Sequence, residues 1–164
     1  MRAWSVLVIL VGCGRVDFDP LAAADDAPAG CLAGYSMLGE SCYRFVINTM
    51  EVSWFEAEVA CEADGAGAHL VVPDTVEEIA LLTPQFTAAQ DAWMGGNDLM
   101  LEGSYLRVIG GPALIAWGSS EPDGDGEDCM QILSAENLLA DRDCTETNDY
   151  ICEYDGIPVD PTAF

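Results

Sequence analysis

Residues 121–129 read EPDGDGEDC, and this stretch decides how the whole chain is interpreted. It holds five carboxylates and no basic residue, and its proline and two glycines favour a loop over a helix or strand. Carboxylates crowded on one loop repel each other unless a cation compensates their charge. Because Ca²⁺ takes oxygen ligands, the stretch predicts a calcium-binding loop, and the alternative is a solvated acidic loop. An EF-hand does not fit, since Ile132 stands where the closing glutamate would be.

The charge balance of the chain agrees with a cation as partner. Among 164 residues, 29 are acidic and five are basic, all of them arginine, which gives a formal net charge of −24. Such a charge excludes binding to nucleic acid or to an anionic membrane surface through electrostatics. The hydrophobic fraction of 51% suffices for the core of one domain with an extension.

The N-terminus predicts export and a lipid anchor. Residues 1–12 form a signal peptide, with Arg2 followed by an apolar run that is much shorter than the roughly 20 residues of a membrane-spanning helix. Residues 10–13, Leu-Val-Gly-Cys, resemble the lipobox of bacterial lipoproteins, which would place a lipid on Cys13; the alternative is an ordinary signal peptide. Residues 13–30 then form a flexible acidic tether. The expected location is the bacterial outer membrane or cell surface, with the chain lipid-anchored.

The cysteine count supports the same compartment. Seven cysteines are present, and setting Cys13 aside leaves six, an even number in an exported chain where disulfides persist. Six cysteines allow 15 pairings, so counting alone does not select one.

The remaining pattern predicts two helices. The first begins at a capping box formed by Ser53 and Glu56, contains Cys61, and carries an apolar face with Phe55 and Val59. The second begins at the same spacing in Asp74 and Glu77 and stops at Pro84. Its expected inner face consists of Val76, Ile79, Ala80 and Leu82.

Short strands and loops complete an α+β fold. His69 is expected to be structural, Trp93 and Trp117 to be core residues, and residues 155–164, with two prolines, to form a loose tail. The expected strands are 42–47, 70–72, 93–95, 105–109, 130–133 and 150–153.

The ordered motifs of the chain resemble the long form of the C-type lectin-like domain over residues 31–154. They are Cys42-Tyr43-Arg44-Phe45, the helix Trp54 to Cys61, Gly67-Ala68-His69-Leu70-Val71, Trp93-Met94-Gly95-Gly96, Glu121-Pro122-Asp123, Glu127-Asp128-Cys129 and Tyr150-Ile151-Cys152-Glu153. The resemblance implies two helices, short antiparallel strands and a long-loop region. It also implies the disulfides Cys31–Cys42, Cys61–Cys152 and Cys129–Cys144, each contributing about 2–5 kcal/mol.

The resemblance also implies two sets of Ca²⁺ ligands. The sugar-type site would use Glu121, Asp123, Glu127 and Asp141, with a cis bond before Pro122. The first three of these would also hydrogen-bond the sugar hydroxyls. An auxiliary site would use Asp98, Glu102, Glu127 and Asp128.

One departure from the family pattern lies at Ala140. The family's Trp-Asn-Asp run reads Leu139-Ala140-Asp141 here, so position 140 offers no oxygen to a metal or a sugar. Asp125 is a possible substitute ligand. The triplet Glu121-Pro122-Asp123 combines features of mannose-type and galactose-type members, so it does not specify one sugar.

The expected function is a calcium-dependent carbohydrate-binding module tethered to the cell surface, with a glycan or cell-surface ligand as its partner. The alternative is a lectin-like interaction or adhesion domain in which calcium is purely structural. An enzyme is not expected, because the acids gather on one loop and no nucleophile and base stand together. The membrane would be contacted only through the lipid anchor.

Overall fold

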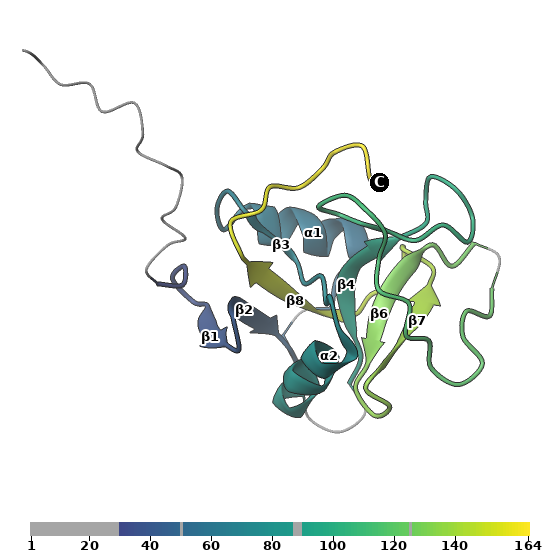
Figure 1. Ribbon diagram of the computed structural model, residues 1–164, viewed down its shortest axis with the longest axis horizontal. Helices are drawn as coiled ribbons and strands as arrows, with labels where there is room; N and C mark the ends of the chain where they lie inside the picture. Colours follow the sequence, from purple (N-terminus) through teal and green to yellow (C-terminus); the bar gives the residue numbers. More distant parts are fainter. Residues whose placement is uncertain (1–29, 50, 87–89, 125) are drawn as a thin grey trace, which may run out of the picture.

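The computed structural model describes residues 30–49, 51–86, 90–124 and 126–164. Two α-helices, α1 (Trp54–Glu62) and α2 (Val76–Leu82), accompany one eight-stranded sheet (Figure 1), so the α+β class is confirmed. Within the described residues, no helix combines the length and apolar character that crossing a membrane requires. The strands are β1 (Ser36–Leu38), β2 (Ser41–Val46), β3 (Ala68–Leu70), β4 (Ala92–Asn97), β5 (Leu106–Arg107), β6 (Cys129–Leu133), β7 (Leu138–Arg142) and β8 (Asp149–Tyr154).

The last strand of the chain joins the two halves of the sheet. Strand β8 pairs antiparallel with β2 and β3 and parallel with β4, in the order β1-β2-β8-β4-β6-β7. Gly96 allows strand β4 to pass close to β6, since a Cβ at this position would lie 2.4 Å from the Met130 sulfur. Strands β1 and β7 were not expected from the sequence, and β7 matters most because it carries Asp141.

Helix α1 buries a different face from the one expected. Ser53 and Glu56 form the capping box as predicted. However, Phe55 is 43% exposed and Val59 is 65% exposed. The buried stripe is Trp54, Ala57, Glu58 and Cys61, which has the i, i+3, i+4, i+7 spacing of one helical face. The expectation was wrong because a buried glutamate, Glu58, stands in that stripe.

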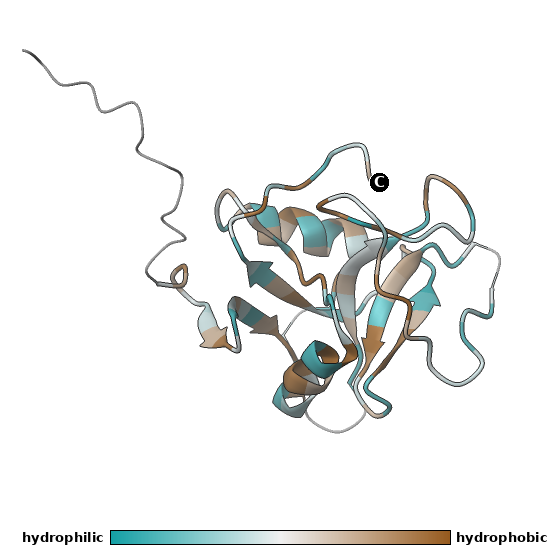
Figure 2. Cartoon of the chain, viewed as in Figure 1, coloured by the Kyte–Doolittle hydropathy of each residue, from teal (hydrophilic) through white to brown (hydrophobic). Residues whose placement is uncertain are grey.

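Helix α2 begins one residue later than its expected cap. The Thr75 side chain accepts a hydrogen bond from the Glu78 amide at 3.2 Å, so Thr75 is the N-cap residue. Ile79 and Leu82 are buried as expected, whereas Val76 and Ala80 are exposed. Pro84 does not stop the chain at once, because a 3₁₀ turn, Thr83–Gln85, follows the helix. Figure 2 shows hydrophilic and hydrophobic segments in both helices, but in α1 these do not follow burial, because Phe55 and Val59 are exposed and Glu58 is buried.

All six cysteines of the described residues form the three expected disulfides. Cys31–Cys42 closes the first hairpin, Cys61–Cys152 joins α1 to β8, and Cys129–Cys144 clamps the segment that contains β6 and β7. The pairing implied by the family resemblance is therefore confirmed.

Residues 155–164 are packed on the domain, in contrast to the loose tail that was expected. The Asp160 amide donates to the Val108 carbonyl at 2.7 Å, and Ala163 is 3% exposed. The Phe164 ring meets the Trp54 ring edge-on, with 5.5 Å between centroids. The tail is ordered because aromatic and backbone contacts at its far end outweigh the effect of its two prolines.

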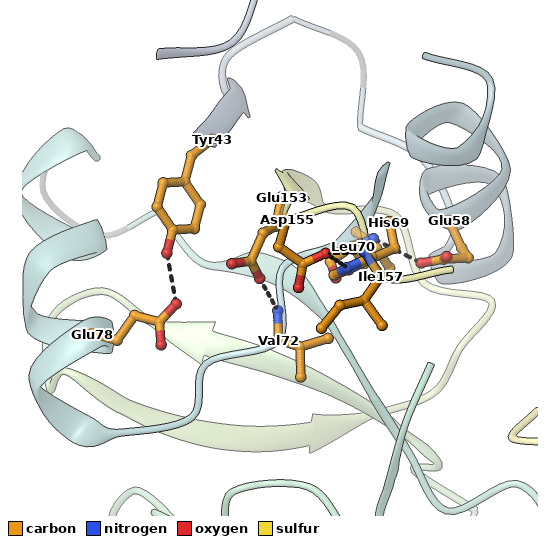
Figure 3. A network of polar contacts seen from close by, with 9 residues as sticks. All are labelled: Tyr43, Glu58, His69, Leu70, Val72, Glu78, Glu153, Asp155 and Ile157. Carbon is orange, nitrogen blue, oxygen red and sulfur yellow. Dashed lines mark hydrogen bonds and ion pairs between the residues drawn. The ribbon is translucent and has the colours of Figure 1, made fainter. Parts of the chain in front are cut away.

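A buried polar network lies between α1, β3 and β8 (Figure 3). The Glu58 carboxylate accepts from the Leu70 amide at 2.9 Å, and the Glu153 carboxylate accepts from the Val72 amide at 3.1 Å. Both ring nitrogens of buried His69 face acceptors, the Leu70 carbonyl at 2.8 Å and an Asp155 oxygen at 3.1 Å. His69 can donate to both only as an imidazolium, and these two bonds anchor its ring between β3 and the residue after β8.

The two buried glutamates make stability depend on pH. Burial raises the pKa of Glu58 and of Glu153 to about 7, from 4.5 for an ordinary glutamate. Because the pKa is higher in the folded state, each glutamate stabilises the fold fully below pH 4.5, and this contribution is lost as pH rises through 7. The loss in the free energy of unfolding is on the order of 2 kcal/mol per residue. The two residues together give about 4 kcal/mol, so we expect a melting temperature about 10–15 °C higher at pH 5 than at pH 8 in EDTA.

The substitution Glu58→Gln tests this pH dependence by thermal melting. It should reduce the difference between pH 5 and pH 8, whereas Glu77→Gln, at an exposed position on α2, should leave it unchanged. Identical pH profiles for the two variants would show that burial of Glu58 is not the cause.

Candidate calcium site in the long loop

The acidic loop is fixed at both ends. The Gly118 amide donates to the Leu139 carbonyl at 2.7 Å, and the Leu139 amide donates to the Ala116 carbonyl at 2.9 Å, so the chain enters the loop along β7. The chain leaves the loop at Cys129, which is bonded to Cys144. The Glu121–Pro122 peptide bond is cis, as the resemblance implied.

Four carboxylates form one group, here called the primary cluster: Glu121, Asp123, Glu127 and Asp141. One oxygen from each lies within 4.8 Å of the others. Three come from the loop and Asp141 comes from β7. Gly124 makes room for this arrangement, since a Cβ there would lie 3.0 Å from two side-chain carbons of Glu127. The structure thus brings together the four residues that the family resemblance assigned to the sugar-type site.

Several oxygens of the primary cluster are buried without a hydrogen-bond partner among the described residues. They are Oε2 of Glu121, Oε2 of Glu127 and Oδ1 of Asp141. Asp141 is 1% exposed, and its Oδ2 accepts from the Tyr105 hydroxyl at 2.9 Å. Burial raises the pKa of Glu121 and of Glu127, although Arg142 opposes the rise in both. Buried carboxylate oxygens without partners are costly, and a hard divalent cation is the group that they fit.

A second group, the auxiliary cluster, consists of Asp98, Glu102 and Asp128, with one oxygen of each within 4.8 Å of the others. Asp98 is 2% exposed; its Oδ2 accepts from the Gly103 amide at 2.6 Å, and its Oδ1 has no partner among the described residues. Burial, together with nearby Asp128 and Asp141, raises the pKa of Asp98. Glu127, expected in both sites, lies with the primary cluster.

Two residues of the site were not found from the sequence. Tyr105 holds Asp141, and its ring meets the half-buried Trp117 ring edge-on at 4.7 Å. Arg142 lies against the primary cluster, with Nη2 at 3.1 Å from Glu121 Oε1 and Nη1 at 3.7 Å from Glu127 Oε2. The available signal was that the chain has only five basic residues and one directly follows an expected ligand.

The remaining expectations concern residues around the clusters. Ala140 is fully buried and is paired with Gln131 of β6, so it supplies no side-chain oxygen. Trp93 is fully buried in the core, as expected. Asp125, the possible substitute ligand, lies outside the described residues, as do Cys13 and the segment 1–29.

An α+β domain with a disulfide-clamped long loop is the architecture of the C-type lectin fold. The family model described as the lectin C-type domain matches residues 50–154, and the chain belongs to this family. Members of the family are in general binding proteins without enzymatic activity.

Individual relatives are similar over about three quarters of the chain. Snaclec 3 of Daboia siamensis is 27% identical over 76% of this chain and 81% of its own length. C-type lectin domain family 4 member M of Hylobates lar is 32% identical over 75% of this chain. The match covers only 31% of that longer protein.

Solved structures share the fold. The carbohydrate-recognition domain of the mouse scavenger receptor C-type lectin has a TM-score of 0.68, with 26% identity over 77% of this chain and 98% of its own. The cow C-type carbohydrate-recognition domain of CD23, solved with the GlcNAc2Man3 oligosaccharide, has a TM-score of 0.65, with 26% identity over 76% of this chain and 95% of its own. A calcium-independent type II antifreeze protein has a TM-score of 0.67, with 23% identity over 77% of this chain and 95% of its own, and shows the fold alone.

Proposed function

We propose that this domain binds carbohydrate in a calcium-dependent manner through its primary cluster. The observation that carries the proposal is the set of buried oxygens on Glu121, Glu127 and Asp141 that lack hydrogen-bond partners among the described residues. These residues, with Asp123, would hold Ca²⁺. A bound Ca²⁺ takes 6–8 oxygens, so positions remain for two vicinal hydroxyls of a sugar.

The loop residues would also orient the sugar. Carboxylates of Glu121, Asp123 and Glu127 can accept hydrogen bonds from the sugar hydroxyls, and charge-assisted bonds of this kind are the stronger ones. The auxiliary cluster would bind a second Ca²⁺ and fix Asp98 against the Asp128 backbone, which it already contacts at 3.0 Å. The oligosaccharide present with the cow domain supports a glycan as the ligand class.

Calorimetry and a glycan array test this function directly. The mature domain should release or absorb heat on titration with Ca²⁺, and it should be retained on at least one glycan in Ca²⁺ and be released by EDTA. Calcium binding without retention on any glycan would reject the carbohydrate function while leaving the metal site intact.

A second function, a lectin-like interaction or adhesion domain without sugar binding, is favoured by Ala140. This residue removes an oxygen that the family pattern uses for both metal and sugar, and among the described residues no fifth Asp, Glu, His or Cys joins the primary cluster. Calcium would then order the loop without contacting the ligand. Binding to a protein surface that persists with excess free monosaccharides would distinguish this function from the first.

For cellular location, we propose residues 1–12 as a signal peptide, 13–30 as a tether with a lipid on Cys13, and 31–154 as the exported binding domain. Three formed disulfides support an oxidising compartment. The two relatives named above come from a snake and a gibbon, so a bacterial lipoprotein rests on the lipobox-like residues 10–13 alone. Mass spectrometry of the N-terminal peptide tests it: an unmodified Cys13, or cleavage elsewhere, rejects the anchor.

A further inference from the structure

We propose that Arg142 is an internal counter-ion that keeps the primary cluster assembled when no metal is bound. The domain would then hold its loop ready for calcium, and its folding would not depend on the metal. The experiments in Ca²⁺ that test this inference rest on the proposed function. The experiments without metal depend only on contacts between residues of this chain.

The geometry places Arg142 where one cation can act on both ends of the loop. Its backbone pairs with Cys129 at the end of β7, two residues before the clamped Cys144. From this fixed position Nη2 lies 3.1 Å from Glu121 Oε1, and Nη1 lies 3.7 Å from Glu127 Oε2. Nη1 also donates to the Asp141 carbonyl at 2.6 Å, which orients the guanidinium. A planar group with several donors suits this bridging role better than an ammonium.

The charges explain why such a residue is needed. The primary cluster contains four carboxylates, with a formal charge of −4, and one guanidinium brings the total to −3. The other arginines of the described residues pair elsewhere, Arg44 with Asp64 and Arg107 with Asp74. Arg142 is therefore the cation that this part of the chain provides at the primary cluster.

The oxygens that Arg142 contacts are compatible with a metal at the same cluster. Arg142 uses Oε1 of Glu121, whereas Oε2 of Glu121 is the buried oxygen without a partner. At Glu127 the guanidinium faces Oε2 itself, at the longer distance of 3.7 Å. A divalent cation could thus take the second oxygen of Glu121 while the first stays with Arg142, and it would replace Arg142 only at Glu127. Arg142 acts as a positioning residue for the two glutamates.

Thermal melting of Arg142→Gln, Arg142→Lys and Arg107→Gln tests the proposal. Arg107 is a matched control because its side chain is 28% exposed, against 27% for Arg142, and it forms one ion pair away from the cluster. In EDTA, Arg142→Gln should melt about 3–6 °C below the unchanged protein, and Arg142→Lys about half as far below. In saturating Ca²⁺ the Arg142→Gln deficit should shrink to less than about 2 °C, because the metal replaces the missing charge. Arg107→Gln should shift equally in both conditions.

Hydrogen exchange gives the second readout. In EDTA, the peptide that contains Glu121 and Glu127 should exchange faster in Arg142→Gln than in the unchanged protein, while peptides of α1 should not change. Equal melting temperatures of Arg142→Gln and the unchanged protein in EDTA would overturn the role. So would an equal deficit with and without Ca²⁺ when the unchanged protein does respond to calcium. If the unchanged protein shows no calcium response, the proposed function fails, and exchange in EDTA alone then decides the role of Arg142.

Discussion

Replacing Glu127 with glutamine is expected to weaken calcium binding about 1,000-fold, since two unit charges 4 Å apart interact by roughly 4 kcal/mol at an effective dielectric constant of 20 and each 1.4 kcal/mol is a factor of ten. Glutamine keeps the length of the side chain, so the change removes one charge and leaves the packing. The carboxylate that loses its charge includes the buried Oε2 of Glu127, which has no hydrogen-bond partner among the described residues. Calorimetric titration with Ca²⁺ measures the change in affinity.

The same variant separates metal binding from folding. Removing one of four like charges should leave the melting temperature in EDTA unchanged or raise it, while the rise caused by Ca²⁺ should shrink. Glu146→Gln is the matched control, because Glu146 is exposed and outside both clusters. Wild-type calcium affinity in Glu127→Gln would show that Glu127 is not a ligand.

Replacing Cys61 and Cys152 together with alanine is expected to lower the free energy of unfolding by about 3–5 kcal/mol. The bridge links residues 91 positions apart, so its loss gives the unfolded chain much more freedom than the loss of either other bridge, which span 11 and 15 positions. Both sulfurs also lie in the core, with Cys61 and Cys152 at 0% exposure. Because a domain of this size is stable by about 5–15 kcal/mol, the loss is a large part of the total.

Urea unfolding of three double variants measures this ranking. The Cys61/Cys152 pair should cost most, the Cys129/Cys144 pair about 3 kcal/mol, and the Cys31/Cys42 pair least. Removal of Cys129–Cys144 should in addition weaken calcium binding, because that bridge fixes the exit of the acidic loop. A Cys31/Cys42 variant as unstable as the Cys61/Cys152 variant would contradict the argument from chain freedom.

Spacing along the chain predicted the class of fold, and the family resemblance implied the disulfides. The reading of the spacing failed where a polar residue is buried or an apolar residue is exposed. Glu58 breaks the apolar stripe of α1, and its burial is possible because it accepts from the Leu70 amide. Val59 is apolar, so the prediction assigned it to the buried face, although it is exposed. The packed tail was missed for a related reason: Phe164 contacts Trp54, a residue 110 positions earlier in the chain, and such a contact leaves no local pattern.

The acidic residues of the candidate site could be predicted, whereas their arrangement and the roles of Tyr105 and Arg142 could not. The family resemblance identified all seven acids, and the structure places them in two groups of four and three. Local sequence does not show that β7 forms, or that its pairing with β6 places Asp141 among the loop carboxylates. It also does not show that the guanidinium of Arg142 contacts these carboxylates. Each of these depends on contacts across the sheet.

The chain enters the described domain at Gly30, beside β1, and the acidic loops lie at the opposite end of the long axis (Figure 1). If the tether proposed for residues 13–30 holds the molecule at a surface, both carboxylate clusters lie at the end of the domain farthest from the attachment.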